Sequence, residues 1–188
     1  MNVWELPTSL VIGGVGYSIR TDFRAILDIL QVMESDEYEE DEKRLIFFTI
    51  FFEDYTQIPK EHYEEAGKKA VEFIDMGMGG NDRNKPRTMD WAKDAPIIIP
   101  AVNRVMGGEI RSMPYVHWWT FMGAYMEIGE SLFSSVLNIR QKRAKGKKLE
   151  KYEQEFYKEN RNLIDLTVAE KRSEEEMDAL RKLFGLSK

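Results

Sequence analysis

The sequence predicts a mainly α protein: a helical domain with a small N-terminal β-hairpin and a C-terminal helical arm. Three observations predict it. Apolar residues recur every three or four positions in several stretches, which is the spacing of one helix face. Two short apolar runs near the start flank a glycine turn. After Gly146 the composition becomes highly charged, so we place the domain at residues 1–145 and the arm at residues 146–188.

The first expected elements are a hairpin and a helix. Residues 10–12 and 17–19 read as two short strands around the glycine turn. The turn begins like a dinucleotide-binding fingerprint, but the sequence lacks its third glycine, so a nucleotide-binding fold is not expected. Thr21 is a suitable N-cap for a helix. One face of that helix would carry Phe23, Ile26, Leu27, Leu30 and Met33.

The next segment predicts two helices and a loop. Residues 39–53 form the second helix, and their wide apolar arc indicates nearly full burial. The third helix begins near Pro59, because proline is tolerated in a first turn. Residues 77–89 carry glycines, asparagines and bases with little to bury. They predict a mobile loop that a protease would cut first.

A fourth helix is expected after this loop. Asp94 can cap it, with Pro96 in its first turn. Pro100 is awkward inside a helix, so the helix either kinks there or begins near Ile99. The glycine pair that starts at Gly107 ends it.

Two more helices carry the aromatic core. Ser112 and Pro114 open the first of these helices, and Gly129 ends it. Ser131 caps the second, which runs beyond Ile139. Aromatic density is highest in this region, so we expect residues 116–139 to be the most buried part of the chain.

The charged arm has one thin apolar stripe. Leu149, Tyr152, Phe156 and Leu163 follow a loose heptad. Residues 167–170 read as a capping box that starts a last helix, which a glycine three residues from the C-terminus ends. The arm either lies along the core or needs a partner.

Composition narrows the function. The chain has no cysteine, so it has no disulfide or thiolate zinc site. No apolar run is long enough to cross a bilayer, and the start lacks a basic region before an apolar stretch, so we expect no membrane contact and no signal peptide. The net charge of −6 argues against nucleic-acid binding. Catalytic motifs are missing, so we expect no enzyme, no metal and no cofactor.

The aromatic segment at His117-Trp118-Trp119 holds two of the four tryptophans. Adjacent residues of a helix point about 100° apart, so both indoles cannot share one narrow stripe. Two interpretations stay open: both tryptophans fill the core, or one fills a groove that binds a partner. Phe121 and Met122 extend the same segment.

Charged residues form three notable groups. Residues 34–42 hold seven acids, and residues 140–151 hold seven bases, among them Lys142, Arg143, Lys147 and Lys148. Each run is either solvated surface or a docking patch for a partner of opposite charge. The third group is Asp22, with its neighbours Phe23 and Arg24, and Arg140. We expect an Asp22–Arg140 ion pair that clamps the first helix to the aromatic region, a structural role.

These blocks, taken in order, resemble one protein family. They are a glycine turn leading to Ile19-x-x-Asp22-Phe23-Arg24, a helix led by Asp94, and His117-Trp118-Trp119-x-Phe121 followed by Ile139-Arg140. This order is similar to the tail-assembly proteins of long-tailed bacteriophages that are named after the fifteenth gene product of their reference phage. The resemblance runs from about residue 6 to about residue 166. The segment Ile98-Ile99-Pro100 departs from the alanine–phenylalanine pair of that family.

The resemblance implies a function. Such proteins are tail assembly chaperones that bind the tape-measure protein and help recruit tail-tube subunits during siphophage tail morphogenesis. It implies the host bacterial cytoplasm as the location, absence from the mature virion and no catalytic residues. We also expect self-association into a homo-oligomer. The alternatives are a structural component of the tail or its connector retained in the virion, and a regulatory or enzymatic phage protein. Our expected partner-binding residues are His117, Trp118, Trp119, Phe121, Met122, Lys142, Arg143, Lys147 and Lys148.

Overall fold

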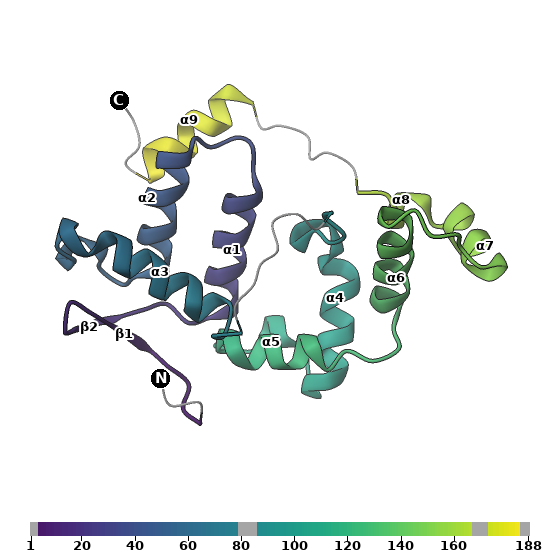
Figure 1. Ribbon diagram of the computed structural model, residues 1–188, viewed down its shortest axis with the longest axis horizontal. Coiled ribbons are helices and arrows are strands. Elements are labelled where there is room, and N and C mark those ends of the chain that lie inside the picture. Colours follow the sequence, from purple (N-terminus) through teal and green to yellow (C-terminus); the bar gives the residue numbers. More distant parts are fainter. Residues whose placement is uncertain (1–3, 79–85, 167–172, 185–188) are drawn as a thin grey trace. The chain divides into compact units, whose positions relative to one another are not determined.

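The computed structural model describes residues 4–78, 86–166 and 173–184 (Figure 1). Over these residues the chain is mainly helical, with one antiparallel two-stranded hairpin near the N-terminus and a helix at the C-terminal end. The predicted fold class is therefore confirmed. None of the described helices is long and apolar enough to cross a membrane.

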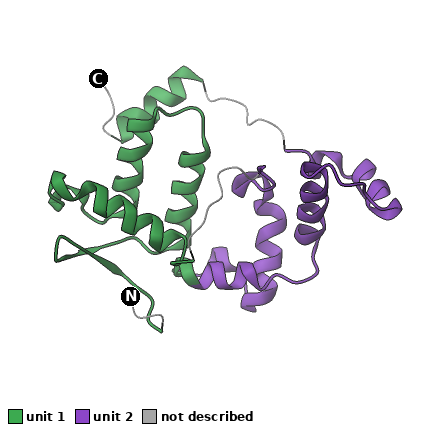
Figure 2. Cartoon of the chain, in the orientation of Figure 1, with its two compact units in different colours: residues 1–80, 115–119, 170–188 green, residues 81–114, 120–169 purple. Residues whose placement is uncertain are grey.

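The chain divides into two compact units (Figure 2). Unit 1 contains residues 1–80, 115–119 and 170–188, and unit 2 contains residues 81–114 and 120–169. The predicted division into a helical core domain at residues 1–145 and a charged helical arm at residues 146–188 stays a prediction.

Unit 1 begins with strands β1 (Ser9–Ile12) and β2 (Val15–Ser18), paired so that Leu10 lies opposite Tyr17. Two features of the turn require glycine at position 13. Its φ is +56°, and an added Cβ would lie 2.5 Å from Nε2 of His62. The hairpin packs on helix α3, where the Gly13 N–H donates to Oε2 of Glu65 at 3.0 Å.

Helices α1 (Phe23–Glu34), α2 (Glu40–Phe51) and α3 (Tyr63–Ile74) follow, and two 3₁₀ turns, η1 (Tyr55–Gln57) and η2 (Lys60–His62), precede α3. The cap of α1 is Asp22 and not Thr21, because the Asp22 carboxylate accepts from the Arg24 N–H at 3.0 Å. Burial is densest along α2 and its cap, in contrast to our expectation for residues 116–139. Five nearly contiguous side chains there are buried: Ile46, Phe47, Phe48, Phe51 and Phe52.

Unit 2 contains α4 (Trp91–Met106), the 3₁₀ turn η3 (Ile110–Ser112), most of α5 (Trp118–Met126), α6 (Leu132–Ala144), α7 (Lys151–Glu159) and α8 (Arg161–Ile164). The start of α4 is earlier than predicted. Asp90 caps it by accepting from the Lys93 N–H at 2.8 Å, which places Asp94 inside the helix. Pro96 and Pro100 both lie within α4 on its exposed side, and Gly107 ends it as predicted, with φ +70°.

Helix α5 begins at Trp118, later than the predicted start at Ser112. The preceding segment is held by backbone hydrogen bonds to α1, such as Phe23 N–H to Val116 O at 2.9 Å, and so it cannot be helical. The cap of α6 at Ser131 is confirmed by reciprocal hydrogen bonds with Ser134.

The remaining predictions concern the loop and the arm. Residues 79–85 of the predicted loop and the predicted capping box at residues 167–170 lie outside the described residues. The last described helix, α9 (Glu174–Leu183), is capped by Ser173 with Glu176.

Candidate functional site

The two adjacent tryptophans close the end of α3. Trp118 Nε1 donates to Ile74 O at 2.9 Å, and Trp119 Nε1 donates to Phe73 O at 2.8 Å. The last carbonyls of a helix lack partners within the helix, so side-chain donors there stabilise its end. Trp118 is only 1% exposed, and Trp119 stacks on Phe73 with ring centroids 5.7 Å apart. The divergence of the two indoles lets them reach two neighbouring carbonyls.

His117 is held by both ring nitrogens. Its Nδ1 accepts from the Trp119 N–H at 3.1 Å, so Nε2 carries the proton and donates to Pro7 O at 3.1 Å. The side chain is buried, and this burial lowers the pKa of His117. A neutral imidazole with both nitrogens occupied is a structural link between the start of α5 and the N-terminal segment.

Asp22 belongs to the same arrangement. Its Oδ2 accepts from the Val116 N–H and from Arg24 Nη1, each at 3.0 Å. The Trp118 N–H donates to Thr21 O at 2.6 Å. Asp22 therefore joins the start of α1 to the start of α5 through the backbone, while the Arg24 guanidinium lies 4.6 Å from the centroid of the Phe23 ring.

Arg20 is a residue whose role sequence reasoning missed. Its Nη1 donates to the carbonyl oxygens of Thr49, Ile50 and Phe52 at 2.8, 2.9 and 2.6 Å. A cation at the C-terminus of a helix also interacts favourably with the helix dipole. No local spacing indicates this cap of α2, because donor and acceptors are about thirty positions apart in the sequence.

The Arg140 ion pair is buried in unit 2, and its partner is Asp94. Arg140 donates from Nη1 to Oδ2 at 2.6 Å and from Nη2 to Oδ1 at 2.8 Å, and the two side chains are 5% and 0% exposed. Three further bonds reach the carbonyl oxygens of Thr88, Leu163 and Ile164. The predicted Asp22–Arg140 pair is wrong, because Asp94 lies inside α4 and presents its carboxylate to α6.

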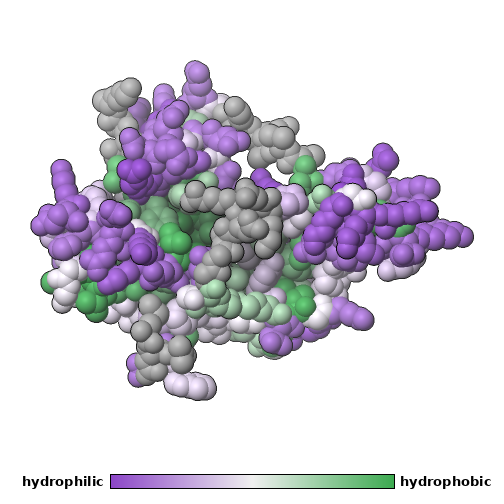
Figure 3. Space-filling view, in the orientation of Figure 1, coloured by the Kyte–Doolittle hydropathy of each residue, from purple (hydrophilic) through white to green (hydrophobic). Residues whose placement is uncertain are grey.

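The basic run after Arg140 contains residues with two different roles. Lys142 pairs with Glu153 at 2.6 Å, which lowers the pKa of that carboxyl group. Arg143 pairs with Asp165 and lies 4.2 Å from the centroid of the Tyr157 ring. Lys147 and Lys148 are exposed on the loop between α6 and α7, and neither has an ion pair among the described residues. In Figure 3, the surface over α7 and this loop is almost uniformly hydrophilic.

The apolar candidates of unit 2 lie mainly inside. Phe121 is 2% exposed and packs near Trp91, with ring centroids 6.3 Å apart, and Met122 is half-buried. Exposed apolar side chains follow them: Met126 at the end of α5 and Leu132 at the start of α6. The structure therefore separates the expected partner-binding residues into interior ones and exposed ones, of which Lys147 and Lys148 are the clearest.

One surface depression lies beside the Arg140 ion pair. A depression of about 370 Å³ is lined by Arg87, Arg140, Arg143, Ile164, Asp165 and Leu166. Each of its three guanidinium groups already pairs with a carboxylate, so it offers no unpaired cation to an anionic ligand. The described part of the chain contains no group of three or more potential metal-ligating side chains.

Comparison with known families gives a match over almost all of this framework. The family model described as bacteriophage Gp15 protein matches residues 4–166. The matched span contains Arg20, Asp22, the tryptophan pair and Arg140, and it ends just after the α8 carbonyls that Arg140 binds. Comparisons with curated proteins and with solved structures give no match. The chain belongs to the bacteriophage Gp15 protein family, and is thus a bacteriophage structural or morphogenesis protein.

Proposed function

We propose that the protein is a tail assembly chaperone that binds the tape-measure protein and helps recruit tail-tube subunits during siphophage tail morphogenesis. The observation that carries this proposal is the family match over residues 4–166. It acts in the host bacterial cytoplasm without catalysis, and self-association accompanies the binding.

The surface chemistry of unit 2 supports the proposal. A tape-measure chain is long and helical, and it exposes apolar stripes before the tail tube encloses it. Met126 and Leu132 are 48% and 47% exposed, and methionine adapts to irregular apolar surfaces. Lys147 and Lys148 have no ion pair within the described part of the chain, and their positive charge increases the rate of encounter with an acidic partner. We propose two contact points for the tape measure, at opposite ends of α6: the apolar pair Met126 and Leu132, and the basic pair Lys147 and Lys148.

Coexpression with the long helical phage protein encoded downstream tests the proposal. The chaperone should raise the soluble yield of that protein and co-purify with it. The double variant Lys147→Glu/Lys148→Glu should weaken the complex and its salt dependence without unfolding the chain, because exposed charges contribute little to stability. Lys60→Glu/Lys68→Glu, on exposed lysines of unit 1, is the matched control with the same change in net charge. Equal solubility of the partner alone would rule the proposal out.

The alternative is a structural component of the tail or its connector that stays in the virion. Mass spectrometry of purified virions separates the two functions. A stoichiometric amount of this chain in mature particles would establish the structural role, whereas its absence agrees with a chaperone that leaves after assembly.

A further inference from the structure

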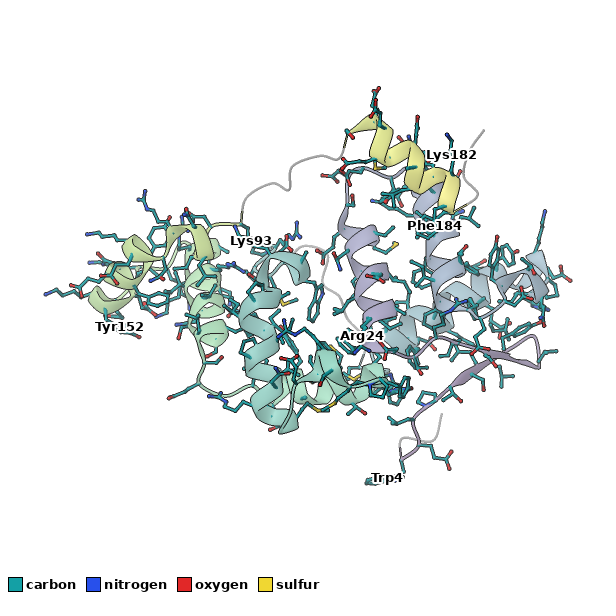
Figure 4. The ribbon with its side chains drawn as sticks, turned by 180° about the vertical axis from the view of Figure 1, so that it is seen from behind. Trp4, Arg24, Lys93, Tyr152, Lys182 and Phe184 are labelled. Carbon is teal, nitrogen blue, oxygen red and sulfur yellow. The ribbon has the colours of Figure 1, made fainter. Side chains whose placement is uncertain are left out.

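The C-terminal helix α9 covers an apolar face that α1 and α2 build at one end of unit 1. Met177 is 6% exposed and packs with Tyr38 and Ile46, which are 7% and 0% exposed. Half-buried side chains surround this centre: Val32 and Ile50 on the α1–α2 side, Leu180 and Phe184 on the α9 side. The contacts from α9 thus fall at positions i, i+3 and i+7, the pattern of a helix that lies in a groove. In Figure 4, Phe184 lies on the side of α9 next to α2, and Lys182 points away from it.

A polar contact orients α9 on this face. Arg181 Nε donates to Oε1 of Glu42 at 2.9 Å. The second oxygen of Glu42 accepts from the Glu39 N–H at 3.0 Å, so the carboxylate is fixed by α2 itself. Two residues of this contact, Tyr38 and Glu42, belong to the acidic run at residues 34–42, which therefore borders the face. A negative rim disfavours nucleic acid and anionic membrane, and it favours a helix with a basic residue.

The α1–α2 face lies within the residues that match the family, and α9 lies outside them. Residues 32–50, which form the face, lie within the family match, whereas α9 lies beyond the matched residues 4–166. A helix of ten residues is too short to be stable alone in water, so the order of α9 depends on this contact. Among the described residues, the printed contacts of α9 with this face come from Met177, Leu180, Phe184 and Arg181, and Leu183 is 77% exposed. A weakly held element of this kind opens at low free-energy cost.

We propose that the α1–α2 face is a binding site for a short amphipathic helix of a partner protein, and that α9 is its intramolecular competitor. The partner helix carries apolar residues at i, i+3 and i+7 and an arginine at i+4, as Met177, Leu180, Phe184 and Arg181 do. An intramolecular competitor acts at an effective concentration on the order of millimolar. Helix α9 therefore excludes helices with low affinity for the face and is displaced by helices with high affinity.

An NMR titration of the full chain with a peptide of residues 173–184 tests this inference. In the variant Met177→Glu/Leu180→Glu, α9 is undocked, and the peptide should shift the amides of Val32, Ile46 and Ile50. The variant should bind the peptide at least about ten-fold more tightly than the natural chain, whose own α9 competes. Leu183→Glu places a single glutamate on the exposed side of α9, so this control should bind as the natural chain does.

A peptide variant and a hydrogen-exchange measurement complete the test. The peptide change Arg181→Glu should weaken binding several-fold, because it places two carboxylates together. Hydrogen exchange of α2 should stay protected in the undocked variant; loss of that protection would make α9 a structural part of unit 1 and overturn the inference. Equal binding to variant and natural chain, or no binding to either, would also overturn it. A dimer that dissociates in the variant would assign the face to α9 of a second copy instead. The titration contains no tape-measure chain, so its outcome is independent of the proposed chaperone function.

Discussion

Each of the two units contains a helix whose last carbonyls accept hydrogen bonds from a distant side chain, but the donors are neutral in unit 1 and charged in unit 2. Unit 1 closes α3 with neutral indole N–H groups inside an aromatic core. Unit 2 caps α8 with a guanidinium that is paired to a buried carboxylate. Removing one partner of a neutral buried hydrogen bond costs about 1–3 kcal/mol. Breaking a buried ion pair costs about 3–5 kcal/mol, so unit 2 is more sensitive to a single substitution.

The family resemblance rests on residues that hold the fold together, and not on the exposed surfaces that we assign to partners. Arg20, Asp22, the tryptophan pair and Arg140 all bind backbone groups that lie far away in the sequence. These residues hold the framework together. The surfaces that we assign to partners lie elsewhere, at exposed positions such as Lys147 and Lys148.

The largest expected effect comes from Arg140→Ala. It leaves the Asp94 carboxylate buried without its partner and should destabilise unit 2 by about 3–5 kcal/mol. Hydrogen exchange should lose protection in α4 and α6 and keep it in α2. The double variant Arg140→Ala/Asp94→Ala should regain part of the loss, because it removes the uncompensated charge. Equal loss of protection in both units would contradict the separation that we draw.

The second effect concerns the neutral caps of unit 1. Trp118→Phe keeps most of the buried apolar surface and removes the donor to Ile74 O, so it should cost about 1–3 kcal/mol in urea unfolding. Trp119→Phe should cost less, because Phe73 O also accepts from the Met76 N–H at 3.0 Å. The reverse order would mean that stacking on Phe73, and not the hydrogen bond, dominates at this helix end.

Local signals in the sequence predict local structure well here. The hairpin, the serine cap of α6 and the glycine end of α4 are correct because each depends on residues within a few positions. The predicted cap of α4, Asp94, is wrong because Asp90 and Asp94 are equally suitable by residue type. Only the buried position of Asp94 opposite Arg140 distinguishes the two residues. The start of α5 was wrong because long-range backbone pairing with α1 overrides a local helix signal.

The candidate site was less predictable than the fold. Residue type identified Arg140 and the tryptophans as notable, but their partners are carbonyls of helices that are distant in sequence. The basic run at residues 140–151 also contains residues in different environments. Lys142 forms an ion pair with Glu153 on α7, whereas Lys147 is exposed and has no ion pair among the described residues. Such pairings depend on the packed helices, and spacing alone does not encode them.

The third effect is at the hairpin of unit 1. Gly13→Ala places a Cβ 2.5 Å from the His62 ring and forces an alanine to φ +56°. The left-handed conformation alone should cost about 1–2 kcal/mol in urea unfolding. Gly16→Ala is the matched control, since its Cβ would meet nothing within 4 Å and its φ is not positive. Equal stability of the two variants would show that the turn relaxes without loss.

The smallest effect is a pH dependence near the ordinary histidine pKa of 6.5, which should appear in unit 1 because both histidines of the chain lie there. Burial lowers the pKa of His117 below its ordinary value of 6.5, so the unfolded chain binds a proton more readily than the folded chain. The contribution of His117 to stability is therefore complete above pH 6.5 and decreases as the pH falls toward its folded pKa. Hydrogen exchange of α3 should record this loss of protection, with α6 as the internal reference. His117→Gln should flatten the profile of α3, because an amide does not titrate, whereas an unchanged profile in that variant would assign the pH dependence to another group.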